Sequence, residues 1–288
     1  SLFYFLHVFD PHNPHIPPSD MLNNATVDFS RTREYNAEFE NAQGNGTYFD
    51  NYQLKHNIDP ELISDVKSWY AKSIQYTSGQ IARLLRYLKS INIFDDSMII
   101  ITGDHGEEFG ERGFFTHTSL YDANIRPFMA IKPPADSGWQ KTEEIDTIDF
   151  LPTIAQLVGA DIPDQCSGTP VQAAGGSTPR ITERIAPDWY SVAVEIDGIK
   201  GIFTYDANYP DRPTEAMVRC GPELIEYYDL SEIRSMNTSE IDPSSAKKEA
   251  LKEAAEDFIF DSDGYSYEGT TAKPSEETLE QLEELGYT

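Results

Sequence analysis

Apolar and polar positions along the first 180 residues predict strands and helices in turn. Residues 2–9 and 97–103 are short, mostly apolar runs, and each is followed by a polar segment rich in Pro or Gly. Runs bounded in this way are typical of buried strands in a parallel sheet. Between them, residues 61–92 carry apolar side chains at spacings of three, four and seven, which predicts one long amphipathic helix.

A strand, a helix and a second strand in this order form a right-handed crossover unit, which predicts an α/β fold with a parallel sheet. A further strand is expected at residues 127–132. A helix is expected at residues 149–158, with Asp149 as its N-cap and Gly159 beyond its end. Residues 160–180 are rich in Gly, Pro and Ser and are interpreted as a linker.

The pattern changes after this linker. Residues 191–196 and 200–205 alternate apolar and polar side chains on either side of Asp197-Gly198, which predicts an antiparallel hairpin. A third strand is expected near residues 224–228, and acidic helices at 240–260 and 275–285. We therefore expect a partial α/β domain over residues 1–180 and a small C-terminal subdomain over residues 181–288.

The charge balance limits the partners of the chain. The net charge is -27, from 49 acidic and 22 basic residues, which argues against nucleic acid and anionic membranes. No apolar run approaches the ~20 residues of a membrane span. The excess is spread along the whole chain, which favours a halophilic source, with an acidic mesophilic protein as the alternative. The cytoplasm is slightly favoured as compartment, and the oligomeric state is left open.

Candidate chemistry lies where the predicted strands end. Asp104 and His105 directly follow the apolar run at 98–101, at the sheet edge where ligands bind in α/β proteins. A carboxylate and an imidazole can hold a divalent cation there, although a capping Asp in a surface turn is the alternative. The predicted topology brings His12 to the same edge. Cys166 has no activating base in the sequence, and an inert thiol is the better interpretation.

Several motifs together resemble the sulfatases of the alkaline phosphatase superfamily. They occur in the order of that family, at residues 10–14, 102–111, 117–122, 125–128, 149–154 and 285–287. The resemblance implies an α/β/α sandwich with a mostly parallel central sheet and a small C-terminal antiparallel β subdomain with helices. It also implies hydrolysis of sulfate esters by a formylglycine nucleophile and a divalent cation. Ca²⁺ is favoured, and Mg²⁺, Mn²⁺ and Zn²⁺ are compatible.

The resemblance also assigns roles to residues. It implies that Asp104 and His105 bind the cation, and that His12 and His117 are catalytic, gripping the sulfate and managing the proton on the leaving oxygen. The substrate would be a small-molecule or carbohydrate sulfate ester. Glu107, Glu108 and Glu111 could be further metal ligands, but they are interpreted as acids at a helix N-terminus. Arg126 is interpreted as a buried ion-pair partner. His7 is expected in the core, and His15 has no distinguishing feature.

One part of the family pattern is missing. The sequence contains no Cys/Ser-x-Pro-x-Arg motif, from which the formylglycine is made. We therefore expect the chain to be the C-terminal portion of a longer sulfatase and to be inactive alone. Two alternatives remain: a phosphoester or phosphonate hydrolase or phosphoglycerol transferase of the same superfamily, and a non-catalytic protein on a degenerate sulfatase fold.

Overall fold

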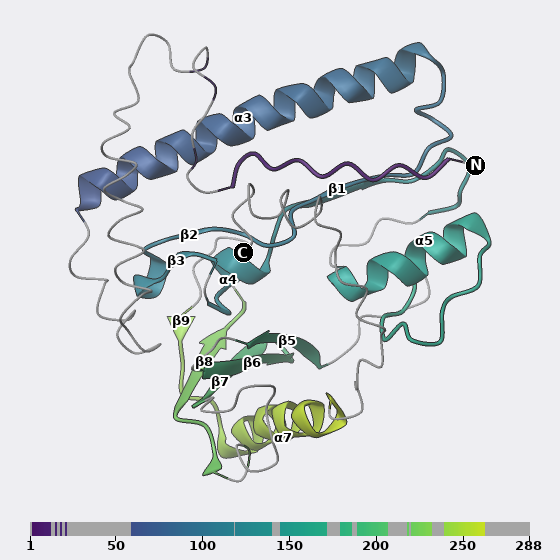
Figure 1. Cartoon of the computed structure of the whole chain (residues 1–288). Coiled ribbons are helices and arrows are strands. Elements are labelled where there is room, and N and C mark those ends of the chain that lie inside the picture. The colour runs from purple at the N-terminus through teal and green to yellow at the C-terminus, as the bar shows by residue number, and fades with distance from the viewer. Residues whose placement is uncertain are drawn as a thin grey trace, which may run out of the picture.

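The chain folds into two parts (Figure 1). The upper part is made of the described residues between 2 and 171 and contains one long helix, and the lower part, between 180 and 262, contains an antiparallel sheet. The structure is a computed structural model. It describes residues 2–12, 15, 18, 21, 59–117, 119–139, 145–171, 179–185, 189–206, 218, 220–231 and 239–262. Most of the polar segment at 19–58 and the acidic helix expected at 275–285 lie outside the described residues.

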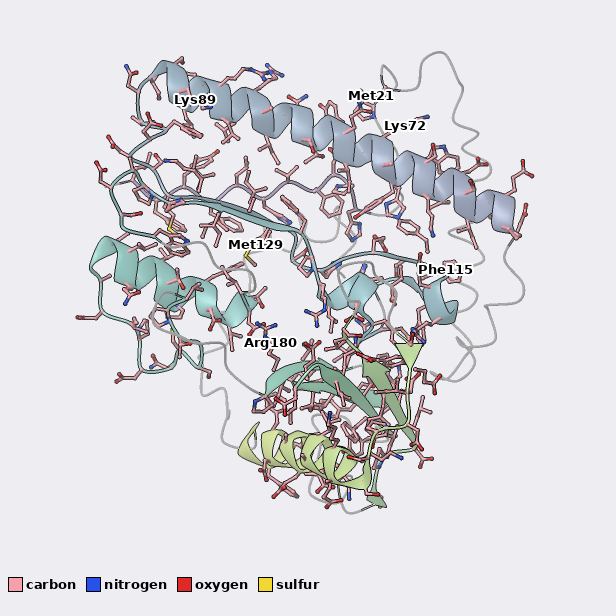
Figure 2. The ribbon with its side chains drawn as sticks, turned by 180° about the vertical axis from the view of Figure 1, so that it is seen from behind. Met21, Lys72, Lys89, Phe115, Met129 and Arg180 are labelled. Carbon is pink, nitrogen blue, oxygen red and sulfur yellow. The ribbon has the colours of Figure 1, made fainter. Side chains whose placement is uncertain are left out.

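The long helix predicted at 61–92 is α3 (Pro60–Ser90). Asp59 caps it by accepting a hydrogen bond from the backbone N–H of Glu61 at 2.9 Å. Its buried face packs against β2 (Glu108–Phe109) and β3 (Phe115–Thr116), which form a short antiparallel pair. The apolar cluster between them contains Leu62, Val66, Trp69, Phe109 and Phe115. Figure 2 shows Phe115 beneath α3.

The expected parallel sheet is not present among the described residues. β1 (Ile99–Thr102) and β4 (Met129–Lys132) form a two-stranded sheet, and they pair antiparallel with Ile100 opposite Ile131. Residues 2–9 run alongside β1 in the same direction in Figures 1 and 2, but none of them is in a strand. The prediction of a mostly parallel central sheet is therefore wrong for the described part of the chain.

The physical reason lies in the surroundings of this apolar run. A buried strand needs neighbours that bond its backbone and cover both of its faces. The side chains of residues 2–6 are instead 50–88% exposed, and His7, expected in the core, is exposed as well. The α/β character remains, because α3 and α5 (Phe150–Val158) lie on either side of β1 and β4 in both figures.

Three short helical turns complete the upper part: η3 (Glu111–Gly113), α4 (Asp122–Ile125) and η4 (Thr147–Asp149). The helix predicted at 149–158 is α5, and Gly159 ends it with a φ of 68°, as expected. Asp149 does not cap α5 through its side chain. Its carboxylate instead accepts a hydrogen bond from the backbone N–H of Thr169 at 2.9 Å, which ties the following segment to the helix.

The lower part is a five-stranded sheet in which every strand pairs antiparallel with the next one along the chain. The strands are β5 (Arg180–Ile185), β6 (Trp189–Ile196), β7 (Ile199–Asp206), β8 (Leu224–Asp229) and β9 (Ser239–Glu240). Asp197 and Gly198 connect β6 and β7 with φ values of 50° and 75°, which suit a tight hairpin turn.

Both faces of this sheet are covered. On one face, α7 (Ser245–Ser262) packs with Leu251, Ala255 and Ile259 against the tyrosine- and valine-rich side of β6 and β7. On the other face, Phe114, Leu120 and Tyr121 of the upper part contact Trp189, Ala193, Ile202 and Tyr228.

The division into domains 1–180 and 181–288 remains a prediction. Within the described residues, no helix has the length and apolar character that a membrane crossing requires.

Candidate active site

The loop after β1 is held tightly against the segment around α4. Gly103 donates a backbone hydrogen bond to Phe128 O at 3.1 Å, and Gly106 donates one to Asn124 O at 2.6 Å. A Cβ atom at Gly106 would lie 1.9 Å from Ala123 O, so only glycine allows this approach. Asp104 and His105 are therefore presented from a backbone that is fixed on both sides.

A ring nitrogen of His105 and a carboxylate oxygen of Asp104, both possible metal ligands, face one another. His105 Nδ1 lies 2.8 Å from Gly106 O, and because a carbonyl oxygen only accepts, Nδ1 carries the proton. The other ring nitrogen, His105 Nε2, lies 3.8 Å from Asp104 Oδ2. A backbone carbonyl that orients the far nitrogen is the usual support of a metal-binding histidine. The side chain of Asp104 is 76% exposed.

Two further histidines lie beside this pair. The ring of His117, which follows β3, has its centroid 4.2 Å from that of His105. His12 lies 5.9 Å from His117, and its ring stacks on Phe9. We call His12, Asp104, His105 and His117 the histidine–carboxylate cluster. The structure brings these four sequence-predicted residues together, and their chemical roles remain predictions.

Burial makes His117 a neutral imidazole at pH 7. Its pKa is lowered from 6.5 to about 4, mainly by burial and further by the nearby His105, His12 and Arg184, while Asp104 opposes the shift. The Nδ1 atom of His117 is buried and has no hydrogen-bond partner among the described residues. The guanidinium of Arg184 donates a hydrogen bond to the backbone carbonyl of His117 at 2.7 Å.

His15 and Glu107 form a second buried group, which the sequence does not predict. His15 is 1% exposed, its Nδ1 lies 2.8 Å from Pro11 O, and its Nε2 lies 3.8 Å from Glu107 Oε2. Burial lowers the pKa of His15 to about 4. Burial, with the neighbouring Glu108, raises the pKa of Glu107 to about 8. No sequence signal marks either residue, because their burial depends on how distant segments pack.

The expectation of acids at a helix N-terminus is wrong for Glu107 and Glu108, which precede or lie in β2, whereas Glu111 does lie in the first turn of the short η3. Glu108 lies in β2, is fully buried, and accepts hydrogen bonds from the backbone N–H and the hydroxyl of Ser119. Glu111 pairs with Lys67 of α3 at 2.8 Å. These acids therefore hold the loops of the site together. Within the described residues, no group of three or more His, Cys, Asp or Glu side chains could by itself hold a metal ion.

Arg126 is an ion-pair partner, as the sequence predicts, but it is half-buried rather than buried. Its guanidinium contacts Asp122 at 3.1 Å and Glu195 of β6 at 2.6 Å. Lys200 of β7 approaches the same Asp122 oxygen at 2.7 Å and is fully buried. These ion pairs join α4, next to the histidine–carboxylate cluster, to the C-terminal sheet.

The fold thus combines an α/β part, with a carboxylate–histidine pair after β1, and an antiparallel sheet. The sequence model of the Sulfatase family matches residues 1–160, more than half of the chain. The chain therefore belongs to the sulfatase family.

Curated relatives agree with this assignment. The chain is 30% identical over 115 residues to an N-acetylglucosamine-6-O-sulfatase of Bacteroides thetaiotaomicron, covering 38% of this chain and 21% of the relative. It is 27% identical over 164 residues to a choline-sulfatase of Rhizobium meliloti, covering 54% and 32%. The chain thus spans about a fifth to a third of the length of these relatives.

Solved structures share the fold at lower identity. One is the structure of a protein in complex with its substrate, D-glucosamine-2-N,6-O-disulfate. Its TM-score is 0.56 and its sequence identity is 18%, and the match covers 82% of this chain and 46% of that chain. Another is a phosphonate monoester hydrolase from Silicibacter pomeroyi, with a TM-score of 0.53 and 18% identity over 72% and 43%.

Proposed function

We propose that the natural protein containing this chain hydrolyses a sulfate ester, with the histidine–carboxylate cluster at its catalytic centre. The observation that carries the proposal is the meeting of His12, His105 and His117 in one place, within a chain of the sulfatase family. The substrate is a small-molecule or carbohydrate sulfate ester. The similarity to a structure that binds a sulfated glucosamine supports this class.

Asp104 and His105 fit a divalent cation. Their donor atoms lie 3.8 Å apart, so both can contact one ion, since Ca²⁺ takes oxygen ligands at about 2.3–2.6 Å. When bound, the cation would stabilise the negative charge that develops as the ester bond breaks. Ca²⁺ is our first choice, and Mg²⁺, Mn²⁺ and Zn²⁺ are alternatives, because an Asp-His pair accepts all of them.

His117 is suited to move a proton on the leaving oxygen. Its pKa of about 4 leaves the ring neutral in the free chain at pH 7. A sulfate anion beside the ring favours the imidazolium and raises this pKa, because opposite charges stabilise one another. The protonated ring would then supply its proton to the leaving alcohol. His12 would bind a sulfate oxygen from the other side of the same cluster.

The nucleophile would come from polypeptide outside these 288 residues. The sequence lacks the Cys/Ser-x-Pro-x-Arg motif, and the chain covers 46% of a solved neighbour. The exposed apolar side chains of residues 2–6 support a further packing partner, since patches of this kind mark interaction sites. The 288-residue chain alone would then show no turnover.

The test compares two leaving groups in the natural protein that contains this chain. We expect His117→Ala to lower kcat/KM by about 10²–10⁴-fold for an alkyl sulfate, which needs a proton on its leaving oxygen, and far less for nitrophenyl sulfate. Asp104→Ala should impair both esters alike, because the cation acts on the sulfate. Lys248→Ala, which changes a residue of α7 whose ion-pair partner Asp242 is exposed, is the control and should change neither.

Equal losses from His117→Ala on both esters would make His117 a binding residue and remove it as the acid. The second candidate function is a phosphoester or phosphonate hydrolase, which the similarity to a phosphonate monoester hydrolase favours. Turnover of phosphonate or phosphate esters without any turnover of sulfate esters would select it. No turnover of either class, in the presence of each metal, would favour a non-catalytic member.

A further inference from the structure

Arg184 reaches from the C-terminal sheet to the histidine–carboxylate cluster. It lies near the end of β5, and one of its guanidinium N–H groups donates to the carbonyl of His117 at 2.7 Å. The guanidinium also lies over the ring of the buried Trp189, 5.4 Å from its centroid. Arg184 is half-buried, and its Nε atom is buried without a partner among the described residues. The guanidinium is thus held in one place by an aromatic ring and a carbonyl oxygen.

The segment that carries His117 needs such support. Thr116, just before it, has a φ of 62°, which is a strained value for a β-branched residue. Backbone strain of this kind persists only where the surroundings over-determine the conformation. On the N-terminal side of His117, Thr116 pairs with Glu108 of β2. On the C-terminal side, Ser119 donates hydrogen bonds to the Glu108 carboxylate. The bond from Arg184 acts between these two contacts.

This bond comes from a different part of the fold. Thr116 and Ser119 both contact Glu108 of β2, so these contacts fix the segment around His117 only relative to β2. Arg184 fixes it relative to the C-terminal sheet, and it acts at His117 itself. A displacement of about 1 Å at a reacting group can cost ~10²-fold in rate, so a fixed carbonyl at this residue matters for the ring that it carries.

We propose that Arg184 is a positioning residue that fixes the backbone of His117 through its carbonyl oxygen, so that the C-terminal sheet orients the His117 ring beside His105. This inference rests on the proposed function for its catalytic consequence. It also makes a structural claim that can be measured without turnover. The C-terminal sheet then contributes to the site although none of its side chains belongs to the histidine–carboxylate cluster.

The matched control lies on the same strand. Arg180 of β5 forms an ion pair with Asp146 at 3.4 Å, and Figure 2 shows it at the junction between the upper part and the sheet. Arg184→Met keeps an unbranched side chain over Trp189 but removes every donor to His117. Arg184→Lys keeps the charge and one donor group. Arg180→Met removes a guanidinium from β5 without touching His117.

Two measurements test the proposal. The first is the imidazole NMR signal of His117 in the 288-residue chain, assigned with His117→Ala. We expect Arg184→Met to shift or broaden it, Arg184→Lys to restore it in part, and Arg180→Met to leave it unchanged. The second is kcat/KM in the natural protein. We expect Arg184→Met to lower turnover of an alkyl sulfate by about 10–100-fold and that of nitrophenyl sulfate far less, the same asymmetry as for His117→Ala.

The outcomes separate this inference from the proposed function. An unchanged His117 signal in Arg184→Met would overturn the positioning role, whatever the enzyme does. Equal losses on both esters, with His117→Ala still selective, would also overturn it. If no sulfate ester is cleaved but the signal changes only in the Arg184 variants, the positioning stands and the proposed function fails. If Arg184→Met does not fold, the partial effect expected of Arg184→Lys decides.

Discussion

Similar apolar sequence is buried in one part of this molecule and exposed in the other. In the C-terminal sheet, residues 189–194 of β6 are all buried, and α7 and the upper part cover the two faces. In the upper part, residues 2–6 are equally apolar but 50–88% exposed and form no strand. Each strand of the C-terminal sheet pairs with its neighbour along the chain, so its contacts are local and are formed at low entropic cost. The apolar run at 2–9 depends on partners that are distant in sequence.

Two phenylalanines test this contrast most directly. Phe203 of β7 is fully buried, whereas Phe5 is 77% exposed. In the 288-residue chain, Phe203→Ala should lower the free energy of unfolding by about 3–5 kcal/mol, because it leaves a cavity in the sheet core. Phe5→Ala should change it by less than about 0.5 kcal/mol. Urea unfolding measures both changes in free energy. Similar losses for the two variants would show that the two apolar segments do not differ in burial.

The ion pairs that join the two parts should give the next largest effect. Lys200 is fully buried against Asp122, and removing one partner leaves a buried charge that is only partly compensated by Arg126. Lys200→Met should therefore lower the free energy of unfolding by about 3 kcal/mol. Lys248→Met is the control, because its partner Asp242 is 88% exposed, and it should have no measurable effect. A loss as small as the control's would mean that the two parts are not held together by this pair.

A buried histidine makes the stability of the upper part sensitive to acid. The pKa of His15 is about 4 in the folded chain and about 6.5 when unfolded, so the unfolded chain binds more protons between these values. The contribution of His15 is complete above pH 6.5 and is lost as the pH falls through 4. The loss amounts to at most about 3 kcal/mol at low pH. Glu107, with its pKa raised from 4.5 to about 8, acts in the opposite sense, and its contribution is lost as the pH rises.

His15→Phe keeps an aromatic ring in the site but removes the titration. As the pH falls from 7 to 4.5, its unfolding free energy should rise relative to that of the unchanged chain, because only the unchanged chain loses the contribution of His15. His7→Phe, at an exposed position, should follow the unchanged chain over the same range. Identical pH profiles for His15→Phe and the unchanged chain would show that His15 is not buried as described.

A hydroxyl at the junction should give the smallest effect. The hydroxyl of Tyr121 donates to the buried Glu226 of β8 at 2.9 Å, and Tyr228 bonds the same carboxylate at 2.6 Å. Because Tyr228 remains, Tyr121→Phe should cost only about 1 kcal/mol of unfolding free energy. The half-buried Tyr227 on the same strand serves as control, and Tyr227→Phe should cost less. A loss above that of Lys200→Met would make this hydroxyl, and not the ion pairs, the main link between the parts.

Local sequence signals were sufficient for several elements. The spacing of Leu62, Val66 and Trp69 predicts α3, and these residues form its buried face. Asp197-Gly198 predicts the hairpin of β6 and β7, because both residues tolerate a positive φ. The order of motifs also predicts the sulfatase family, which the match over residues 1–160 confirms. All of these signals act within a few residues or repeat a fixed motif.

The sequence by itself determined the helix pattern, the hairpin turn, the family and the four residues of the histidine–carboxylate cluster as candidates. Only the tertiary structure decided that residues 2–9 stay outside a sheet, that His15 and Glu107 are buried together, and that Arg184 meets the His117 carbonyl. The physical reason is that periodicity and turn chemistry are local properties. Burial, ion pairing and strand pairing depend instead on which distant segments pack against one another.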